Sequence, residues 1–477
     1  MKTKNVWNTY GAAQLKNMER FAASYRNFLD NGKTERECVD QIVERIEEQG
    51  YRELSTVRKA GKKLKAGDKV YAVNMNKSVI MFCVGKDDLE TGMNILGAHI
   101  DSPRMDVKQN PLYQSGDFVY LDTHYYGGIK KYQWVTLPLA LHGVVVKKDG
   151  TTVLINIGEE ADDPVFFVSD LLIHLAGEQM DKKAAKVIEG EALDIIIGNK
   201  PIKLTAAQKK AEAAKAGSDP DEEKKDPFTR EILRILKEQY DIEEEDFLSA
   251  EIEVVPAGKS RDAGFDRSMI LGYGHDDRVC AFSSMEAMLA IGSPKRTTCC
   301  ILVDKEEIGS VGATGMRSRF FENSVAELME LCGGYRELPM RRALAASRML
   351  SSDVSAGFDP TYASCFEKKN AAFLGHGMVF NKFTGARGKS GSNDANAEYM
   401  ALIRRIMDEG KVCYQTAELG KVDLGGGGTI AYILSLYGMD VIDCGVAVLN
   451  MHAPWEAISK ADLYETFRGY QAFLKSL

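Results

Sequence analysis

The sequence predicts an α/β protein with a mixed sheet and a β-rich segment inserted into it. Three observations carry this prediction: a helix pattern near the N-terminus, crowded strand patterns with turn signals at residues 110–155, and alternating helix and strand patterns after residue 260. Such alternation is typical of a sheet covered by helices on both faces. The chain has 477 residues, which is long enough for more than one domain.

The N-terminal part contains a helix with a clear start. Thr34 and Glu37 form the capping-box pattern, in which each side chain accepts the other residue's backbone N–H. Apolar residues then recur on one helical face, and Gly50 can end the helix. Three short apolar runs follow, and we predict them as strands: residues 69–75, 78–85 and 93–100.

The middle of the chain has a different character. Aromatic and β-branched residues, separated by turn signals, predict strands or hairpins at 118–128, 132–143 and 144–157. Residues 203–247 are charged, alanine-rich and interrupted by prolines, which favours a helix, an exposed loop and a second helix at 230–240. We interpret the charged stretch as solvated surface, with contact to a specific charged partner as the alternative.

Helix and strand patterns alternate through the C-terminal part. The predicted helices are 279–292, 393–410 and 429–438. The predicted strands are 297–304, 377–383 and 439–450. Most of the residues that could carry chemistry lie at the boundaries of these elements.

Composition limits the kinds of partner and compartment. A net charge of −8 argues against nucleic acid or an anionic membrane as the main partner. No apolar run approaches the ~18–20 residues that cross a bilayer, and the first residues contain no apolar core of a secretion signal. The nine cysteines form no Cys-x-x-Cys pair, so buried thiols in a reducing cytoplasm fit better than disulfides or a cysteine-type zinc site.

Five short segments place metal-ligand residue types at the ends of apolar runs, where α/β sheets build their sites. Each segment alone is a weak signal, since a single histidine is often structural and adjacent glutamates usually point into water. Together the five segments favour one shared site. The residues are His99 and Asp101, Asp276 and Asp277, Glu306 and Glu307, Asp353, and His452.

The Glu306–Glu307 pair is the sharpest of these signals. The pair follows an apolar run that we predict as a buried strand, and adjacent carboxylates repel each other more strongly in such surroundings. Divalent cations offset this cost, because one glutamate can bind metal while its neighbour stays free as a general base. Imidazole and carboxylate ligands suit zinc, and also cobalt or manganese.

The order and spacing of these motifs resemble those of the aspartyl aminopeptidase family of dinuclear metallopeptidases, which is related to the tetrahedral aminopeptidases. The resemblance extends from about residue 90 to the C-terminus. It is carried by the motifs GAHIDSPR, the DDR of GHDDRV, DKEEIGS, SSD and NMHAP.

The resemblance implies two divalent metal ions, with zinc favoured and cobalt or manganese as alternatives. His99 and Asp353 would bind one ion. Glu307 and His452 would bind the other. Asp276 would bridge the two ions.

The resemblance also implies two catalytic roles beyond the ligands. Glu306 would act as the general base and then as the general acid. Asp101 would orient His99 through the ring nitrogen that does not bind metal. Asp277 would support the local geometry.

A domain organisation and an assembly follow from the same resemblance. Residues 1–105 and 259–477 would form a split catalytic domain, and residues 106–258 an inserted dimerisation domain. The protein would form a homo-oligomer, a tetrahedral dodecamer built from dimers, whose interior chamber admits peptides. His174 would reach the active site of a neighbouring subunit, with a structural histidine on an apolar helix face as the alternative.

The specificity residues of the family are not all present. Acid-selective members carry a histidine three residues after the metal-binding aspartate, where this chain has Ala356, and their substrate-binding tyrosine has no match. Their lysine falls near Asn381 or Lys382. Lys382, Arg387 and Lys389 could pair with an acidic substrate side chain, or they could be solvated loop charges.

The glycine-rich run DLGGGGTIAYILSLYG contains Gly427. The resemblance places this run beside the substrate pocket. A phosphate cradle at a helix start is the alternative, although the run lacks the Gly-Lys-Ser/Thr ending of a P-loop.

The expected function is that of a cytoplasmic, metal-dependent aminopeptidase that releases N-terminal amino acids from peptides, with acidic residues among the candidate substrates. An aminopeptidase of neutral or basic specificity is one alternative. An N-acyl amino acid deacylase could use the same dinuclear site. A non-catalytic scaffold that kept the fold is a third alternative.

Overall fold

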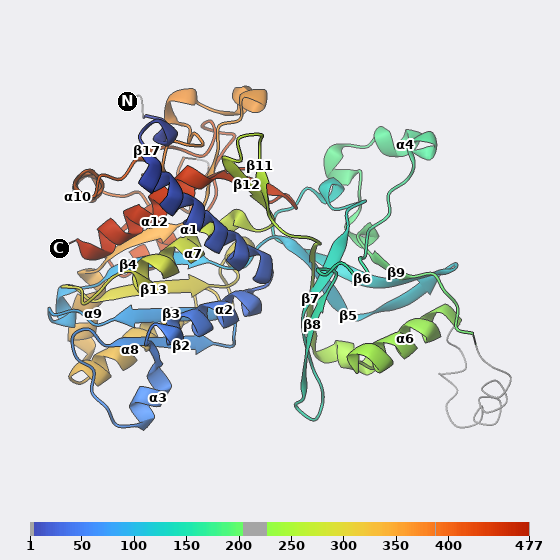
Figure 1. Ribbon diagram of the computed structural model, residues 1–477, viewed down its shortest axis with the longest axis horizontal. Helices are drawn as coiled ribbons and strands as arrows, with labels where there is room; N and C mark the ends of the chain where they lie inside the picture. Colours follow the sequence, from blue (N-terminus) through green and yellow to red (C-terminus); the bar gives the residue numbers. More distant parts are fainter. Residues whose placement is uncertain (1–3, 204–226, 387, 477) are drawn as a thin grey trace. The chain divides into compact units, whose positions relative to one another are not determined.

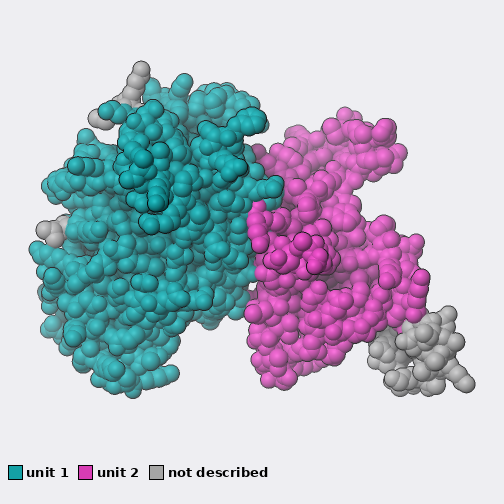
Figure 2. Space-filling view, in the orientation of Figure 1, with its two compact units in different colours: residues 1–102, 260–477 teal, residues 103–259 magenta. Residues whose placement is uncertain are grey.

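The computed structural model describes residues 4–203, 227–386 and 388–476. The chain divides into two compact units, coloured separately in Figure 2: unit 1 comprises Met1–Ser102 and Ser260–Leu477, and unit 2 comprises Pro103–Lys259. The expected insert, 106–258, lies within unit 2. Most of the charged stretch at 203–226 lies outside the described residues. Among the described residues, no helix has both the length and the apolarity needed to cross a membrane.

Unit 1 is built on a nine-stranded mixed sheet with the strand order β1-β2-β3-β13-β4-β14-β18-β16-β17. The central strands β13, β4, β14 and β18 run parallel, so their carboxyl ends meet at one edge of the sheet. In sheet order the strands are Arg52–Glu53, Lys69–Asn74, Ser78–Cys83, Thr298–Val303, Asn94–His99, Arg348–Ser352, Asp440–Gly445, Met378–Asn381 and Tyr414–Thr416.

Helices cover both faces of this sheet (Figure 1). One face packs against α1 (Ala12–Asn31), α2 (Glu35–Glu48), α7 (His275–Leu289), α10 (Ala397–Glu409) and α12 (Lys460–Lys475). The other face packs against α3 (Leu54–Lys59), α8 (Phe320–Cys332), α9 (Glu337–Ala345) and α11 (Ala431–Ser435).

The central strands are buried on both sides, and their residues alternate between the two cores. In β3, Met81 belongs to the core with α1 and α7, whereas Ile80 and Phe82 belong to the opposite core. This alternation explains why the strands read as continuous apolar runs in the sequence. The predicted cap of α2 also forms: the Thr34 side chain accepts the Glu37 N–H at 3.2 Å.

A second, five-stranded sheet completes unit 1, with the strand order β11-β12-β20-β19-β15. In that order the strands are Arg261–Ala263, Met269–Gly272, Glu456–Ser459, Ala447–Leu449 and Ser355–Ala356. β19 and β20 pair antiparallel, and the connection between them carries His452.

Unit 2 contains a six-stranded antiparallel sheet with the order β8-β7-β10-β5-β6-β9. The α-helices among its described residues are α4 (Gly177–Met180) and α6 (Pro227–Tyr240), and α6 contains the predicted 230–240 helix. In sheet order the strands are Thr152–Ile157, Leu139–Val146, Ala250–Pro256, Arg104–Ser115, Phe118–Tyr126 and Ile195–Gly198.

The strand expected at 132–143 forms only from Leu139 onward. A short 3-10 turn, Lys131–Gln133, precedes the fully buried Trp134, and Thr136 has a positive φ of 60°. Thr136, with its left-handed backbone, and the proline two residues after it interrupt the strand, because neither residue continues regular strand pairing. The overall prediction of an α/β class with mixed sheets is confirmed.

Candidate metal centre and active site

The candidate ligands come from elements whose ends converge at one edge of the central sheet. His99 ends β4, and Asp353 follows β14, the parallel neighbour of β4. Glu307 follows β13, the parallel neighbour on the other side. Asp276 lies in the first turn of α7, and His452 comes from the connection between β19 and β20. Segments from residue 99 to residue 452 are therefore gathered at one place.

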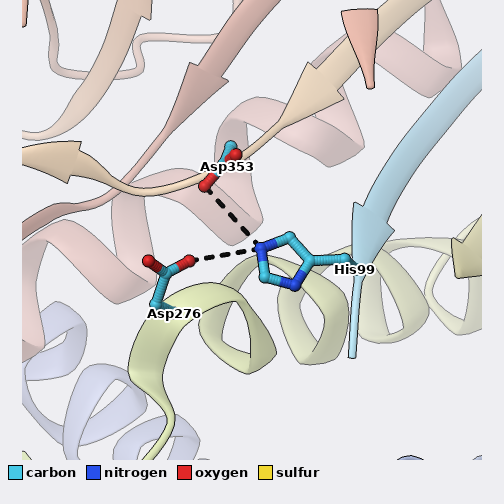
Figure 3. A group of neighbouring side chains, drawn as sticks. All are labelled: His99, Asp276 and Asp353. Carbon is cyan, nitrogen blue, oxygen red and sulfur yellow. Dashed lines mark ion pairs between the residues drawn. The ribbon is translucent and has the colours of Figure 1, made fainter. Parts of the chain in front are cut away.

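Three of these side chains form one compact group, drawn in Figure 3. His99 Nε2 lies 3.2 Å from Asp276 Oδ1 and 3.9 Å from Asp353 Oδ1. His99 and Asp276 are almost completely buried. One imidazole and two carboxylates at this spacing can surround a single cation.

A second group shares Asp276 with the first. His452 Nε2 lies 3.4 Å from Asp276 Oδ2 and 3.4 Å from Glu307 Oε2. The potential ligand atoms of each group lie within 4.8 Å of one another. Asp276 therefore presents one carboxylate oxygen to each group.

The electrostatics of the two groups favour bound cations. Glu307 Oε1 is buried without a hydrogen-bond partner among the described residues. Burial, followed by the nearby charge of Asp276, raises the pKa of both Glu307 and Asp353. A divalent cation relieves this repulsion, because its charge stabilises the ionised carboxylates. The set of two histidines and three carboxylates fits zinc.

Glu306 is adjacent to the second group but belongs to neither. It begins the 3-10 turn Glu306–Ile308 and lines the same cavity as the two groups. Burial raises the pKa of Glu306 to about 8, with the charges of Asp353 and Asp101 adding to the shift. A carboxylate with this pKa that is not a ligand can accept and return a proton near neutral pH.

Asp101 connects His99 to the glutamate pair. Its carboxylate accepts the backbone N–H groups of Glu306 and Glu307, each at 3.1 Å. His99 Nδ1 lies 3.3 Å from the Asp101 carboxylate and 3.0 Å from the Asp101 carbonyl oxygen. Burial lowers the pKa of His99, but the neighbouring acids Asp101, Asp276 and Asp353 raise it by more.

Sequence reasoning missed Glu456. This buried residue opens β20, and its two carboxylate oxygens accept the backbone N–H of Asp276 at 3.0 Å and that of His452 at 2.7 Å. Glu456 thus holds the backbone of two candidate ligands from different segments. Its place four residues after His452 is the sequence signal that could have identified it.

A cavity of about 440 Å³ lies next to the two groups. Gly427 lines it, and a Cβ atom added at Gly427 would meet nothing within 4 Å. Apart from the acids and His452, the lining consists of Gly309, Ser310, Val354, Ser355, Asn381, Thr384, Leu419, Gly426, Gly427, Gly428, Thr429, Tyr432 and Met451. The glycine-rich run therefore forms an open wall of this cavity.

The other predicted substrate-binding residues lie elsewhere. Lys382 is 46% exposed, does not line the cavity, and pairs its ammonium with Asp394, which also binds Lys389 at 2.9 Å. Arg387 lies outside the described residues. His174 belongs to unit 2, where it is exposed in the 3-10 turn Ile173–Leu175.

A mixed sheet that brings histidines and carboxylates together beside a cavity, with a half-buried glutamate next to them that is not a ligand, defines the class of metal-dependent hydrolases. The comparisons with known proteins give the family. The profile of peptidase family M18, described as aminopeptidase I zinc metalloprotease, matches residues 28–474. The chain belongs to this family.

Individual relatives agree with the family match. A protein of Clostridium acetobutylicum named "Probable M18 family aminopeptidase 1" is 60% identical over 99% of this chain and 98% of its own length. The crystal structure of aminopeptidase I from that organism has a TM-score of 0.88 at 57% identity, with full coverage of both chains. An M18 aminopeptidase from Thermotoga maritima has a TM-score of 0.91 at 41% identity, also with full coverage of both.

The predictions of family, fold class and aminopeptidase activity are confirmed, and the protein is a zinc metallo-aminopeptidase. The family assignment favours this activity over the deacylase and scaffold alternatives.

Proposed function

We propose that the aminopeptidase site holds two divalent ions. His99 and Asp353 would hold the first, Glu307 and His452 would hold the second, and Asp276 would contribute to both. The proposal rests on the orientation of the Asp276 carboxylate: its Oδ1 faces His99, and its Oδ2 faces His452. Zinc is the expected metal, with cobalt or manganese as alternatives that suit the same ligands.

The bound ions would polarise the scissile carbonyl and lower the pKa of the attacking water. Glu306 takes the proton from this water and delivers it to the nitrogen of the leaving peptide. Burial and the charges of Asp353 and Asp101 raise the pKa of Glu306, which makes this carboxylate a stronger base than a solvent-exposed glutamate. Asp101 is a positioning residue, since it contacts both His99 and the backbone of Glu306.

We extend the proposal to a homo-oligomer, a dodecamer built from dimers, in which unit 2 serves as the dimerisation domain. Unit 2 exposes an apolar segment around His174. Several exposed apolar side chains close together in the sequence favour burial against a partner. Its members are Leu171, Leu172, Ile173, Leu175 and Met180, each between 46% and 69% exposed. A yeast protein of the same fold, Ape1, forms a dodecamer at 19% identity and a TM-score of 0.75. In this arrangement His174 reaches the substrate site of a neighbouring subunit.

Peptides in the cytoplasm are the proposed substrates. All nine cysteines are free, which suits a reducing compartment. The net charge of −8 argues against nucleic acid as a partner.

Replacement of Glu306 by glutamine tests the catalytic assignment. Glu306→Gln cannot accept a proton, so kcat should fall by about 10²–10⁴-fold, while zinc content stays the same. The assay uses amino-acid p-nitroanilides on chelated protein and after zinc, cobalt or manganese is restored. Glu322→Gln, a change on the surface helix α8, is the matched control. Wild-type turnover by Glu306→Gln would exclude this role.

A further inference from the structure

One buried acid in the cavity belongs to neither metal group. Asp443 lies in β18, is only 2% exposed and lines the cavity. The Thr429 hydroxyl donates to Asp443 Oδ1, but Oδ2 has no hydrogen-bond partner among the described residues. A buried carboxylate oxygen without a donor is costly, so such an atom in a cavity points to a donor supplied by a ligand.

The residue across from Asp443 does not supply this donor. Asn381 in β16 is the cross-strand partner of Asp443 and also lines the cavity. Its amide bonds to other residues: Nδ2 donates to the Ala417 carbonyl at 3.0 Å, and Oδ1 accepts from Ser355 Oγ at 2.6 Å. No lysine or arginine occurs among the described residues that line the cavity. Among the described residues, no cationic side chain of the lining therefore pairs with Asp443.

The position of Asp443 separates it from the reacting centre. It pairs with Ser351 on β14, two residues before Asp353. Two residues of a strand span about 7 Å. Asp443 is thus displaced along the sheet from Asp353 but lines the same cavity, where it can meet the side chain of a substrate residue.

We propose that Asp443 is a specificity-determining residue that binds the cationic side chain of an N-terminal lysine or arginine and disfavours aspartate and glutamate. This inference rests on the proposed aminopeptidase site and names its substrate class. An ammonium or guanidinium group supplies the donor that Asp443 Oδ2 lacks, and a charge-assisted hydrogen bond is stronger than a neutral one. An acidic side chain would place a second negative charge against Asp443 with no cation in the lining.

Substrate preference measured with zinc-loaded protein tests the proposal. The quantity is kcat/KM for the p-nitroanilides of Lys, Arg, Leu, Ala, Glu and Asp. Wild-type protein should cleave the Lys and Arg substrates at least about tenfold better than Glu and Asp. Asp443→Asn keeps an oxygen for Thr429 and removes the charge, so the Lys-to-Leu ratio should fall about tenfold or more.

A second variant keeps the test decisive if Asp443→Asn does not fold. Asn381→Lys places a cation opposite Asp443, so it should lower the Lys-to-Leu ratio and raise the Glu-to-Leu ratio. Asp408→Asn removes the same charge from an exposed position on α10 and should leave both ratios unchanged.

Each result separates this inference from the proposed function. A wild-type preference for Glu or Asp overturns the inference but leaves the aminopeptidase site in place. An equal loss of Lys and Leu cleavage in Asp443→Asn also overturns it, because a structural or α-amino role affects every substrate. Failure to cleave any substrate with any metal would overturn the proposed site itself.

Discussion

Asp101 accepts a hydrogen bond from the backbone N–H of Glu306, with 3.1 Å between Oδ1 and the nitrogen. The same oxygen lies 3.3 Å from His99 Nδ1. One carboxylate therefore orients a candidate metal ligand and the candidate general base together. The two residues belong to segments that are separated in the sequence by the whole of unit 2.

Loss of Asp101 should weaken metal binding and catalysis together. Asp101→Ala removes the acceptor of the His99 ring and of two backbone N–H groups, so zinc affinity should fall about 10–100-fold. Competition with a chromogenic chelator measures this affinity, and kcat with saturating zinc measures the effect on the base. Asp408→Ala, on the exposed face of α10, is the control. Unchanged zinc affinity in Asp101→Ala would contradict the positioning role.

The shared position of Asp276 predicts unequal effects of ligand removal. His452→Ala affects only the second group, so the protein should retain one tightly bound ion per chain. Asp276→Ala affects both groups and should lower the affinity of both sites. Elemental analysis after gel filtration gives the number of ions per chain. If both variants keep two ions, the bridging assignment is wrong.

Asp462 predicts a pH dependence of stability away from the active site. Burial raises its pKa to about 8, although its carboxylate accepts two backbone N–H groups, from Gly375 and Gly377, each at 2.7 Å. Between about pH 4 and pH 8, Asp462 is therefore protonated in the folded protein but ionised in the unfolded chain. Stability from this group is fully present below about pH 4 and falls as the pH rises, by up to ~1.4 kcal/mol per pH unit.

Urea unfolding of the chelated protein at pH 5 and pH 7.5 measures this dependence. The free energy of unfolding should fall more steeply with pH in the wild type than in Asp462→Asn, by up to about 3 kcal/mol over the interval. Asp408→Asn should follow the wild type, since the Asp408 side chain is exposed. If the free energy of unfolding changes with pH equally in the wild type and in Asp462→Asn, Asp462 is ionised in the folded protein.

The exposed apolar segment of unit 2 predicts an effect on assembly. Ile173→Asp with Leu175→Asp places two charges on side chains that are 68% and 69% exposed, so folding should persist while association weakens. Light scattering should then show a smaller species than the wild type. Met75→Asp changes an equally exposed apolar residue in the turn between β2 and β3 and serves as the control. An unchanged mass would argue against this segment as an interface.

The candidate ligands could be identified from sequence because each lies at the end of an apolar run. Residues such as His99 and Glu307 are polar groups in predictable places, and the order of the motifs pointed to one site. The fold class was predictable for the same reason, since doubly buried strands and capped helices leave strong periodic patterns.

The remaining residues of the site depend on contacts that no local pattern records. Glu456 acts through the backbone of Asp276, and Asp443 matters because its partner across the sheet is Asn381. The sequence could not decide between Asn381 and Lys382, because the end of β16, which lies between them, cannot be located to a single residue from a local pattern. The structure places Asn381 in the cavity wall and Lys382 at the surface.

The gathering of ligands from residue 99 to residue 452 has a consequence for protein synthesis. During translation, β4 with His99 emerges early but must wait for β13 and β14, its neighbours in the finished sheet. His452 emerges close to the end of the chain. A chain that has not yet reached residue 452 therefore lacks at least one proposed ligand, so the complete metal site cannot assemble before that residue is made.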